Sequence, residues 1–296
     1  MLTLIASLPL LGALVISIMK KENATAIKVA ALVTSLLPAL ATIAMTLGFD
    51  KSATGFQYVE RYAWIKSLGI NYQLGVDGIS LVLILLSTIL VPIVIAAGWN
   101  ESEGGRFSVK TFYILIMILE TMMIGVFAAT DLFLFYVFFE ATLIPMFIII
   151  GIWGGPNRVY AAVKFFLYTL MGSLLSLVAL IYLYIQADHS FSLIDYYRLP
   201  LPMHAQVMVF LAFFMAFAVK VPMWPVHTWL PDVHVGAPTG GSAVLAAIML
   251  KLGAYGFLRF SLPIAPDASH HLSAFIIAIS LIAVIYIGLV ALVQAD

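Results

Sequence analysis

The sequence predicts an all-α protein that crosses a membrane many times, as a bundle of about nine helices. Of its 296 residues, 64% are hydrophobic and only 9% are charged, and the apolar residues form long, nearly uninterrupted runs. A soluble domain carries roughly 25% charged residues, and a membrane-spanning helix needs about 20 largely apolar ones. The apolar runs are therefore too long and too many to form only the core of a soluble protein.

The predicted membrane helices follow one another with mostly short connections. They cover residues 2–19, 27–48, 77–98, 111–130, 131–153, 160–186, 204–221, 240–262 and 272–293. Only Thr130 and Asp131 separate the fourth run from the fifth, which predicts a very tight helical hairpin. Residues 49–75 and 187–204 are predicted as polar loops. No linker divides the chain, so residues 1–296 are predicted to form a single transmembrane domain.

Composition also excludes several classes of site. The formal net charge is zero, so nothing indicates a nucleic acid partner. The chain has no cysteine, which excludes disulfides, thiolate metal sites and iron–sulfur ligation by this chain. Metal-binding, catalytic-serine and phosphate-binding motifs are missing too. We therefore expect no cofactor and no metal on this chain, and place any redox centre on other subunits.

The start of the chain and the loop charges predict the orientation. Residues 1–19 are apolar and lack the basic region of a cleaved signal peptide, so they are predicted to be the first membrane helix. The short loops on one side of the membrane carry more Lys and Arg than those on the other, which indicates the cytoplasmic side. This bias places the N-terminus on the outer side.

Of the charged side chains that fall inside predicted helices, we single out five as functional candidates: Glu120, Glu140, Lys164, Lys220 and Lys251. A charge at the centre of a membrane costs about 2.5–3.5 kcal/mol, so such residues usually face the bundle interior and find a partner there. Glu140 and Lys251 are predicted near the midplane, and small neighbours predict that Lys251 is clamped within the bundle. Glu120 is either a second proton site or a structural hydrogen-bonding group. Lys164 has interfacial anchoring as an equal alternative.

Lys220 stands directly before a series of prolines. Pro222 and Pro225 remove backbone donors and clash with the preceding turn, which predicts that the seventh helix breaks just after Lys220. Broken helices inside membranes are tolerated within protein or beside water, and they recur at the ion sites of transporters. The alternative is a re-entrant loop that only caps the bundle.

Two histidines, His227 and His234, flank this break. Their spacing places them on one face of a helix if one forms there, and histidine passes protons near neutral pH. The alternative for each is a hydrogen-bonded structural residue.

A buried lysine near a carboxylate can hold and release a proton. Burial disfavours the charged amine, and an approaching carboxylate favours it again. Glu140 and Lys220 on neighbouring helices would thus form a switchable proton-holding site, and Lys251 would give the proton a next position. The alternative for Lys251 is a fixed structural ion pair.

The motifs around these residues resemble subunit M of the respiratory NADH–quinone oxidoreductase, complex I, and its mitochondrial counterpart, subunit four. The resemblance covers nearly the whole chain. It is carried by LGVDGIS at 74–80, TDLFLFYVFFE at 130–140, IWGG at 152–155, AAVKFFLYT at 161–169, KVPMWPVHTWLPD at 220–232 and LKLGAYG at 250–256.

This resemblance implies specific roles. Glu140 would modulate the proton affinity of Lys220, and Lys251 would relay the proton onward, with His227 as an intermediate. NADH, FMN, iron–sulfur clusters and quinone would belong to partner subunits. Neighbouring antiporter-like subunits would be the protein partners, in the lipid bilayer of a bacterial inner membrane.

The chain departs from the family pattern in length. Family members have about fourteen helices in two inverted five-helix repeats, whereas this chain ends after nine. The first repeat, about 111–262, is predicted to be intact and the second incomplete. We therefore expect a fragment, which would not complete a proton path alone.

Three other functions remain as alternatives. A subunit of a multi-subunit sodium/proton antiporter would share the fold and the Glu140–Lys220 pair. A membrane subunit of a formate- or hydrogen-linked complex is a second relative. A scaffold subunit that transports nothing is the third, and it would tolerate the loss of Lys220.

Overall fold

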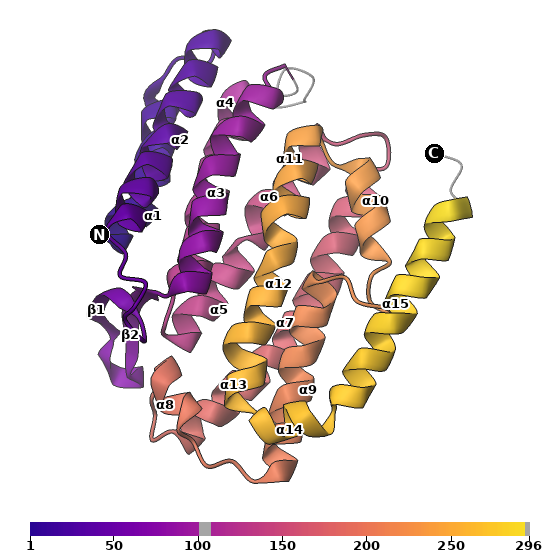
Figure 1. Cartoon of the computed structure of the whole chain (residues 1–296). Coiled ribbons are helices and arrows are strands. Elements are labelled where there is room, and N and C mark those ends of the chain that lie inside the picture. Colours follow the sequence, from indigo (N-terminus) through magenta and orange to yellow (C-terminus); the bar gives the residue numbers. More distant parts are fainter. Residues whose placement is uncertain (101–107, 294–296) are drawn as a thin grey trace.

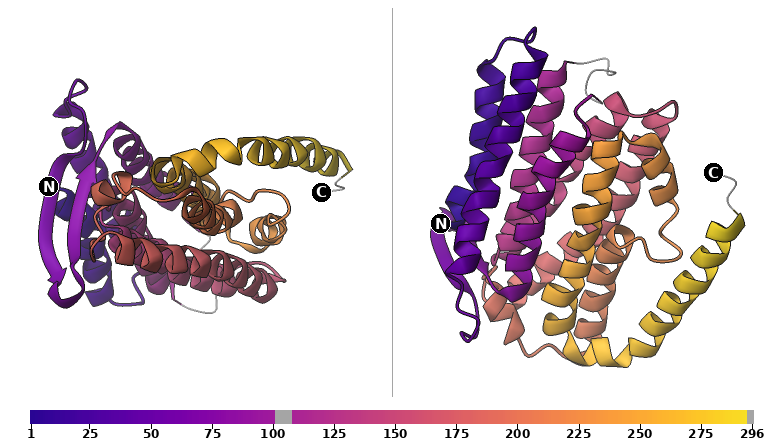
Figure 2. Two further views of the ribbon diagram at one scale, coloured as in Figure 1. Left: turned by 90° about the horizontal axis from the view of Figure 1, so that it is seen from below. Right: turned by 45° about the horizontal axis from the view of Figure 1, so that its top comes forward.

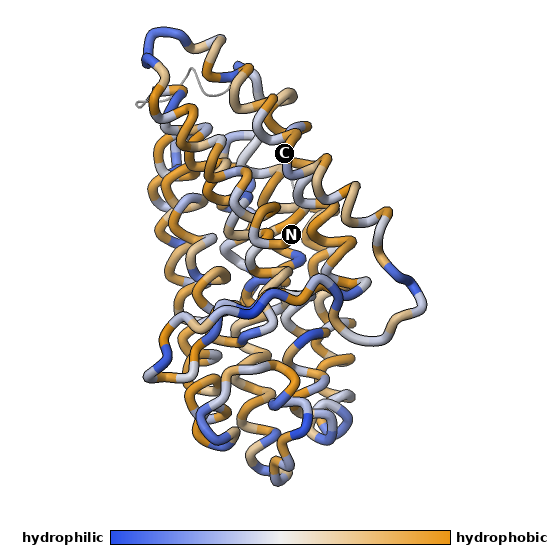
Figure 3. Tube along the Cα trace, turned by 90° about the vertical axis from the view of Figure 1, so that its left-hand side faces the viewer, coloured by the Kyte–Doolittle hydropathy of each residue, from blue (hydrophilic) through white to orange (hydrophobic). Residues whose placement is uncertain are grey.

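The computed structural model describes residues 1–100 and 108–293. Within these residues, eight helices are long and apolar enough to cross a membrane, and the first helix is shorter but also apolar. The helices lie side by side in an elongated bundle (Figure 1). Hydrophobic residues dominate along the helices, and hydrophilic stretches concentrate in the connections (Figure 3). The prediction of a polytopic all-α protein is confirmed.

Each predicted membrane run corresponds to helical structure, with ends shifted by a few residues. The helices are α1 (Leu2–Ile18), α2 (Ala24–Leu47), α3 (Gly78–Ala97), α4 (Val109–Ala128), α5 (Leu132–Ala141), α6 (Leu143–Trp153), α7 (Arg158–Gln186), α8 (Leu193–Tyr197), α9 (Met203–Lys220), α10 (Trp229–Gly236), α11 (Thr239–Val244), α12 (Leu250–Gly256), α13 (Leu262–Ile264), α14 (Pro266–His271) and α15 (Ser273–Val293).

The predicted tight hairpin between the fourth and fifth runs is present. Asp131 caps α5, because its carboxylate accepts from the backbone N–H of Leu134 at 3.0 Å and of Asn71 at 3.1 Å. Side-chain oxygens at this position satisfy N–H groups that the first helical turn leaves free. The fifth run is not one continuous helix, since Thr142 divides it into α5 and α6.

The predicted polar loop at 49–75 was wrong in part, because it contains a β-hairpin. Strands β1 (Gln57–Ile65) and β2 (Ile70–Val76) pair antiparallel, and Gly69 adopts a positive φ of 67° at the turn. A left-handed backbone is least costly for glycine. Strand β2 is largely buried against the bundle, whereas β1 is mostly exposed. Aromatic and β-branched residues favour these strands. The charged residues that stand among them led to the prediction of a polar loop.

Close packing between α9 and α12 positions the centre of the bundle. A Cβ atom on Gly256 would lie 2.3 Å from the Phe217 ring, and one on Gly253 would lie 2.8 Å from the Phe217 carbonyl oxygen. Small residues let membrane helices approach in this way. By contrast, α15 diverges from the other helices in Figures 1 and 2, and Ile279 is the only buried residue described in it.

The membrane span from α11 to α13 is not a regular α-helix. Two π-helical segments, Leu245–Met249 and Phe257–Ser261, interrupt it on either side of α12. Such π-turns are rare and frequently occur at functional sites. They flank the part of the span that carries Lys251.

Candidate functional site

The helix carrying Lys220 ends at that residue, as predicted from the prolines. Two of the carbonyl groups near the break find new donors. The indole N–H of Trp229 donates to the carbonyl of Val219 at 3.0 Å, and the backbone N–H of Met223 donates to Ala218 at 2.9 Å. A break inside a membrane requires such replacement of lost helical hydrogen bonds. The broken segment is therefore held by the bundle itself.

The side chain of Lys220 lies in an apolar and aromatic environment. It is only 2% exposed, and its Nζ stands 4.9 Å from the centre of the Phe139 ring and 5.7 Å from that of Phe165. Among the described residues, Nζ has no hydrogen-bond partner. Aromatic faces attract a cation but do not replace the hydrogen bonds of water. The ammonium form of Lys220 therefore depends on a nearby negative charge.

Glu140 provides that charge from α5, directly after Phe139. Its carboxylate interacts electrostatically with Lys220 and lies within hydrogen-bonding reach of the Ser173 hydroxyl on α7. No direct bond joins the two charged groups, because Oε1 of Glu140 and Nζ of Lys220 both lack hydrogen-bond partners in the described part of the chain. The structure thus brings these two predicted residues together without locking them in a fixed ion pair.

Lys164 is not a free interfacial anchor. Its Nζ donates to Oδ2 of Asp232 at 2.6 Å, so α7 is tied to α10. Tyr168 lies one turn after Lys164 on α7, and its hydroxyl group lies 2.8 Å from that of Thr228, the residue directly before α10. These two contacts fasten the segment that follows the break onto α7. Sequence reasoning gave Asp232 no role, although it stands at the end of the KVPMWPVHTWLPD motif.

The two histidines do not lie on one helix, so the condition under which they would share a helix face is not met. Helix α10 begins at Trp229, so His227 lies in the irregular segment before it. The Nδ1 atom of His227 has no hydrogen-bond partner in the residues that the structure describes, and its ring lies 6.0 Å from that of Tyr286. His234 is engaged instead, since its Nδ1 lies 2.5 Å from the Ser242 hydroxyl.

The prediction that Lys251 is clamped inside the bundle was wrong. Its side chain is exposed in the described part of the chain, and Nζ donates to the carbonyl of Ala246 at 2.6 Å. The small residues of this helix do face α9, as Gly253 shows. However, Lys251 stands two positions earlier, about 200° around the helix at 100° per residue. The packing face and the lysine therefore point in opposite directions.

Glu120 is the most deeply buried of the predicted carboxylates. It is 0% exposed on α4, and neither of its oxygens has a hydrogen-bond partner among the described residues. Its predicted alternative as a structural hydrogen-bonding group thus has no partner to support it. Within the described residues, therefore, no hydrogen bond joins its carboxylate to Lys220.

Sequence reasoning also missed an ion pair at the end of the eighth predicted run. Arg259 is 8% exposed and donates through its NH2 group to Oδ1 of Asp77 at 2.6 Å. A helix-end arginine usually reaches water, so position alone predicted nothing unusual. The available signal was Asp77 itself, a carboxylate inside the LGVDGIS motif with no assigned role.

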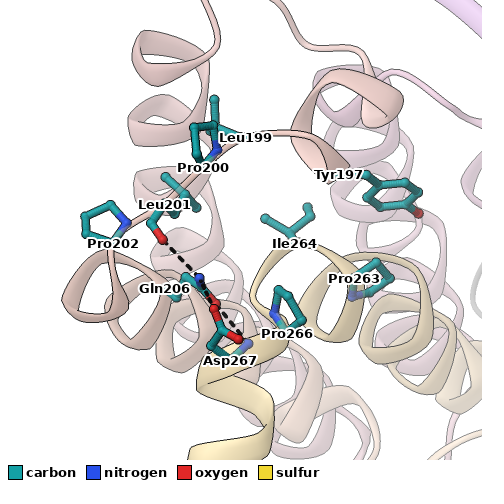
Figure 4. A pocket seen from close by; sticks show the side chains of 10 residues that line it. All are labelled: Tyr197, Leu199, Pro200, Leu201, Pro202, Gln206, Pro263, Ile264, Pro266 and Asp267. Atoms are coloured by element: carbon teal, nitrogen blue, oxygen red, sulfur yellow. Dashed lines mark hydrogen bonds between the residues drawn. The ribbon is translucent and has the colours of Figure 1, made fainter.

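A separate cavity of 440 Å³ lies where α9 begins, at the opposite end of that helix from Lys220 (Figure 4). Gln206 donates there to the Leu201 carbonyl at 3.0 Å and to the Asp267 carboxylate at 2.9 Å, and accepts from the Asp267 backbone at 3.0 Å. The amide group is fully used in joining α9 to α14. We therefore interpret the residues that line this cavity as a structural connection between α9 and α14.

Two family models together match almost the whole chain. One is described as NADH:quinone oxidoreductase/Mrp antiporter, TM, and matches residues 129–296. The other is described as NADH-ubiquinone oxidoreductase chain 4, amino terminus, and matches residues 1–126.

Curated relatives agree with these matches. The chain is 47% identical to NADH-quinone oxidoreductase subunit M of Rhodobacter capsulatus, over 100% of this chain and 60% of the relative. It is 45% identical to NADH-ubiquinone oxidoreductase chain 4 of Arabidopsis thaliana, over 97% of this chain and 58% of that relative. The chain thus spans about 60% of the length of these relatives.

Solved structures show the same likeness. A chain in respiratory complex I from Thermus thermophilus with bound NADH matches with a TM-score of 0.81 and 29% identity, over 93% of this chain and 56% of that one. A chain of the Mrp complex from Dietzia sp. shares the fold, with a TM-score of 0.76 and 23% identity over 90% of this chain and 29% of that one. The chain belongs to the NADH:quinone oxidoreductase/Mrp antiporter family of membrane proteins, and its relatives include subunit M of NADH–quinone oxidoreductase.

Proposed function

We propose that this chain is part of a proton-translocating membrane-arm subunit of NADH–quinone oxidoreductase. The observation that carries the proposal is the state of Lys220, which is 2% exposed, has no hydrogen-bond partner in the described residues and has Glu140 within electrostatic reach. A structural ion pair would be closed and fully hydrogen-bonded. An open pair in an apolar site is suited to gaining and losing a proton.

The proposed mechanism uses the distance between Glu140 and Lys220. When the carboxylate approaches, it stabilises the ammonium form, and Lys220 takes up a proton at Nζ. When the carboxylate withdraws, burial favours the neutral amine, and Nζ releases the proton. His227, whose Nδ1 has no hydrogen-bond partner among the described residues, lies beyond the break as an intermediate, and Lys251 is the next acceptor. Further proton sites at Glu120, His234 and Lys164 remain lesser parts of this proposal.

The rest of the machinery lies outside this chain. We assign NADH oxidation, FMN, the iron–sulfur clusters and quinone to partner subunits, and place neighbouring antiporter-like subunits beside this one. Residues 111–262 would form the translocating repeat, in a bacterial inner membrane with the N-terminus on the outer side. Electron transfer would then drive the movement of Glu140 through contacts along the membrane arm.

Replacing Lys220 by Met in the complete complex tests this function. Met keeps the length of the side chain but holds no proton, so we expect both NADH–quinone turnover and proton uptake into inverted vesicles to fall by more than about tenfold. The exposed loop residue Lys21 provides the matched control, Lys21→Met. Assembled complex that keeps normal turnover with Met at position 220 would favour a scaffold subunit instead.

A sodium/proton antiporter subunit is the second candidate, because the matching family model covers both kinds of protein. It would use the same Glu140–Lys220 pair without NADH. The two functions separate when vesicles are given a sodium gradient and no NADH. Proton movement that depends on Lys220 under these conditions would favour the antiporter, and its absence together with NADH-driven uptake would favour the oxidoreductase.

A further inference from the structure

The LGVDGIS motif has no part in the proton relay described above, but the structure gives its aspartate a specific partner. Asp77 caps α3 by accepting from the backbone N–H of Ser80 at 3.0 Å. The same carboxylate oxygen accepts from Arg259 at 2.6 Å, and Arg259 also donates to the Ser80 hydroxyl at 3.2 Å. The start of α3 is thereby bound to the π-helical end of the span that carries Lys251.

Tyr255 extends this ion pair into a buried network. Its hydroxyl donates to the Phe127 carbonyl at 3.0 Å, lies 3.1 Å from the Ser80 hydroxyl and accepts from Nε of Arg259 at 3.2 Å. Three membrane helices, α3, α4 and α12, meet at this one hydroxyl group. The guanidinium group also lies 5.0 Å from the centre of the Phe56 ring, next to the β-hairpin.

The charged groups of the pair are held ionised. Burial opposes ionisation of Asp77, but the hydrogen bonds from Arg259 and Ser80 outweigh it and lower the pKa of this carboxyl. Arg259 is 8% exposed and has no other acidic partner among the described ion pairs. Removing one member of such a pair leaves the other charge buried and unmatched, which is strongly unfavourable.

The network reaches the relay through packed rings. The Tyr255 ring lies 6.4 Å from that of Phe135, which stacks on Phe139 at 5.5 Å. Phe139 is the ring that stands 4.9 Å from Nζ of Lys220. On α12, which also carries Tyr255, a Cβ atom at Gly253 would lie 2.9 Å from Cβ of Lys220. The position of α12 therefore determines both the wall around Lys220 and the place of Lys251.

We propose that Asp77 and Arg259 are positioning residues of the proton relay, whose ion pair fixes α12 and with it the geometry between Lys220 and Lys251. This inference rests on the function proposed above. We assign the proton to neither residue, since Asp77 and Arg259 bond to each other and Arg259 also donates to the hydroxyl groups of Ser80 and Tyr255. Packed interiors transmit such a constraint because their side chains have few alternative arrangements.

The test uses the complete complex in native membranes with the variants Asp77→Asn, Arg259→Gln, the double variant and Arg259→Lys. We expect each neutral single variant to lower turnover per assembled complex by about tenfold, since small errors in placement are costly to a reaction. The double variant should be no slower than either single variant, because both remove the same contact. Arg259→Lys keeps the charge and should recover most of the rate, with the KM for quinone unchanged throughout.

A control variant and two contrary results complete this test. Arg198→Gln removes an exposed arginine from the loop that precedes α9 and should leave turnover unchanged. Normal turnover in either single variant, or multiplied losses in the double variant, would overturn the inference. If Arg259→Gln does not assemble, Tyr255→Phe removes only the bridging hydroxyl, and normal turnover in that variant also overturns it.

Glu140→Gln, measured in parallel, separates the two proposals. Loss of turnover there, with normal rates in the Asp77 and Arg259 variants, would refute the positioning role alone. Normal turnover with Gln at position 140 would refute the relay itself.

Discussion

At the scale of single residues, two kinds of charged group can be distinguished around the site. Asp77 with Arg259 and Lys164 with Asp232 form direct ion pairs at 2.6 Å. In the described part of the chain, Lys220 lies against two aromatic rings and near a carboxylate that does not bond to it. Because a closed pair has a fixed charge state and an open one does not, the difference between the two kinds distinguishes structural charges from those suited to proton transfer.

Asp131 predicts a pH dependence of stability. Burial raises the pKa of its carboxyl to about 6 in the folded protein, although the backbone N–H groups of Leu134 and Asn71 oppose the rise. The folded state therefore binds this proton more tightly than the unfolded state. The contribution to stability is fully present below about pH 4 and is lost as the pH rises through about 6, by about 3 kcal/mol in total.

Asp131→Asn should remove this dependence, because an amide keeps an acceptor oxygen for the cap and does not titrate. Thermal unfolding of the detergent-solubilised protein between pH 4 and pH 7.5 measures it. The wild type should lose more stability than the variant across this range. Parallel curves for the two proteins would show that Asp131 does not titrate there.

At the scale of elements, α9 and α12 pack closely beside Lys220. Gly256→Ala should destabilise this packing, because the added Cβ would lie 2.3 Å from the Phe217 ring. Overpacking of this kind typically costs about 1–3 kcal/mol. Gly288→Ala is the matched control on α15, where a Cβ meets nothing within 4 Å. Equal melting temperatures for the two variants would contradict the described packing.

The ion pair between α7 and α10 predicts that the effects of mutating Lys164 and Asp232 are coupled. Lys164→Gln and Asp232→Asn should each loosen the segment after the break, and both should have similar effects because they remove the same contact. Limited proteolysis and turnover of the four members of this double-mutant cycle measure the coupling. Since both side chains are partly exposed, with 20% and 40% relative exposure, we expect a modest coupling of about 1 kcal/mol or less. Strictly additive effects on proteolysis and turnover would show that the ion pair does not hold α10 against α7.

The sequence predicted the elements better than it predicted side-chain directions. Apolar length located every membrane helix, and the prolines located the end of α9 at Lys220, because both effects are local. The β-hairpin was missed because its charged residues interrupt the alternating pattern. Lys251 was placed wrongly because small neighbours reveal that a helix packs closely, but not which face does so. The partners Asp77 and Asp232 lie far along the chain from Arg259 and Lys164, and only the fold brings them together.

At the scale of the whole molecule, Glu140 and Lys220 lie in a bundle whose helices are joined by ion pairs and hydrogen bonds between side chains. The two ion pairs and the hydrogen bonds of Gln206 lie around this centre and hold α3, α7, α9, α10 and α12 in place. Within the described residues, this pair combines a buried lysine with a nearby carboxylate that is not bonded to it, so we expect it to respond to a moving charge. The central claim is that proton translocation passes through it.

Replacing Glu140 by Gln tests that claim most directly, because it keeps the shape of the side chain and removes its charge. The measurement is NADH-driven proton uptake into inverted vesicles, made together with NADH–quinone turnover and normalised to assembled complex. Glu22→Gln, in an exposed loop, is the control. We predict that both activities fall by more than about tenfold at position 140 only. Near-normal uptake and turnover in assembled complex would contradict the Glu140–Lys220 mechanism.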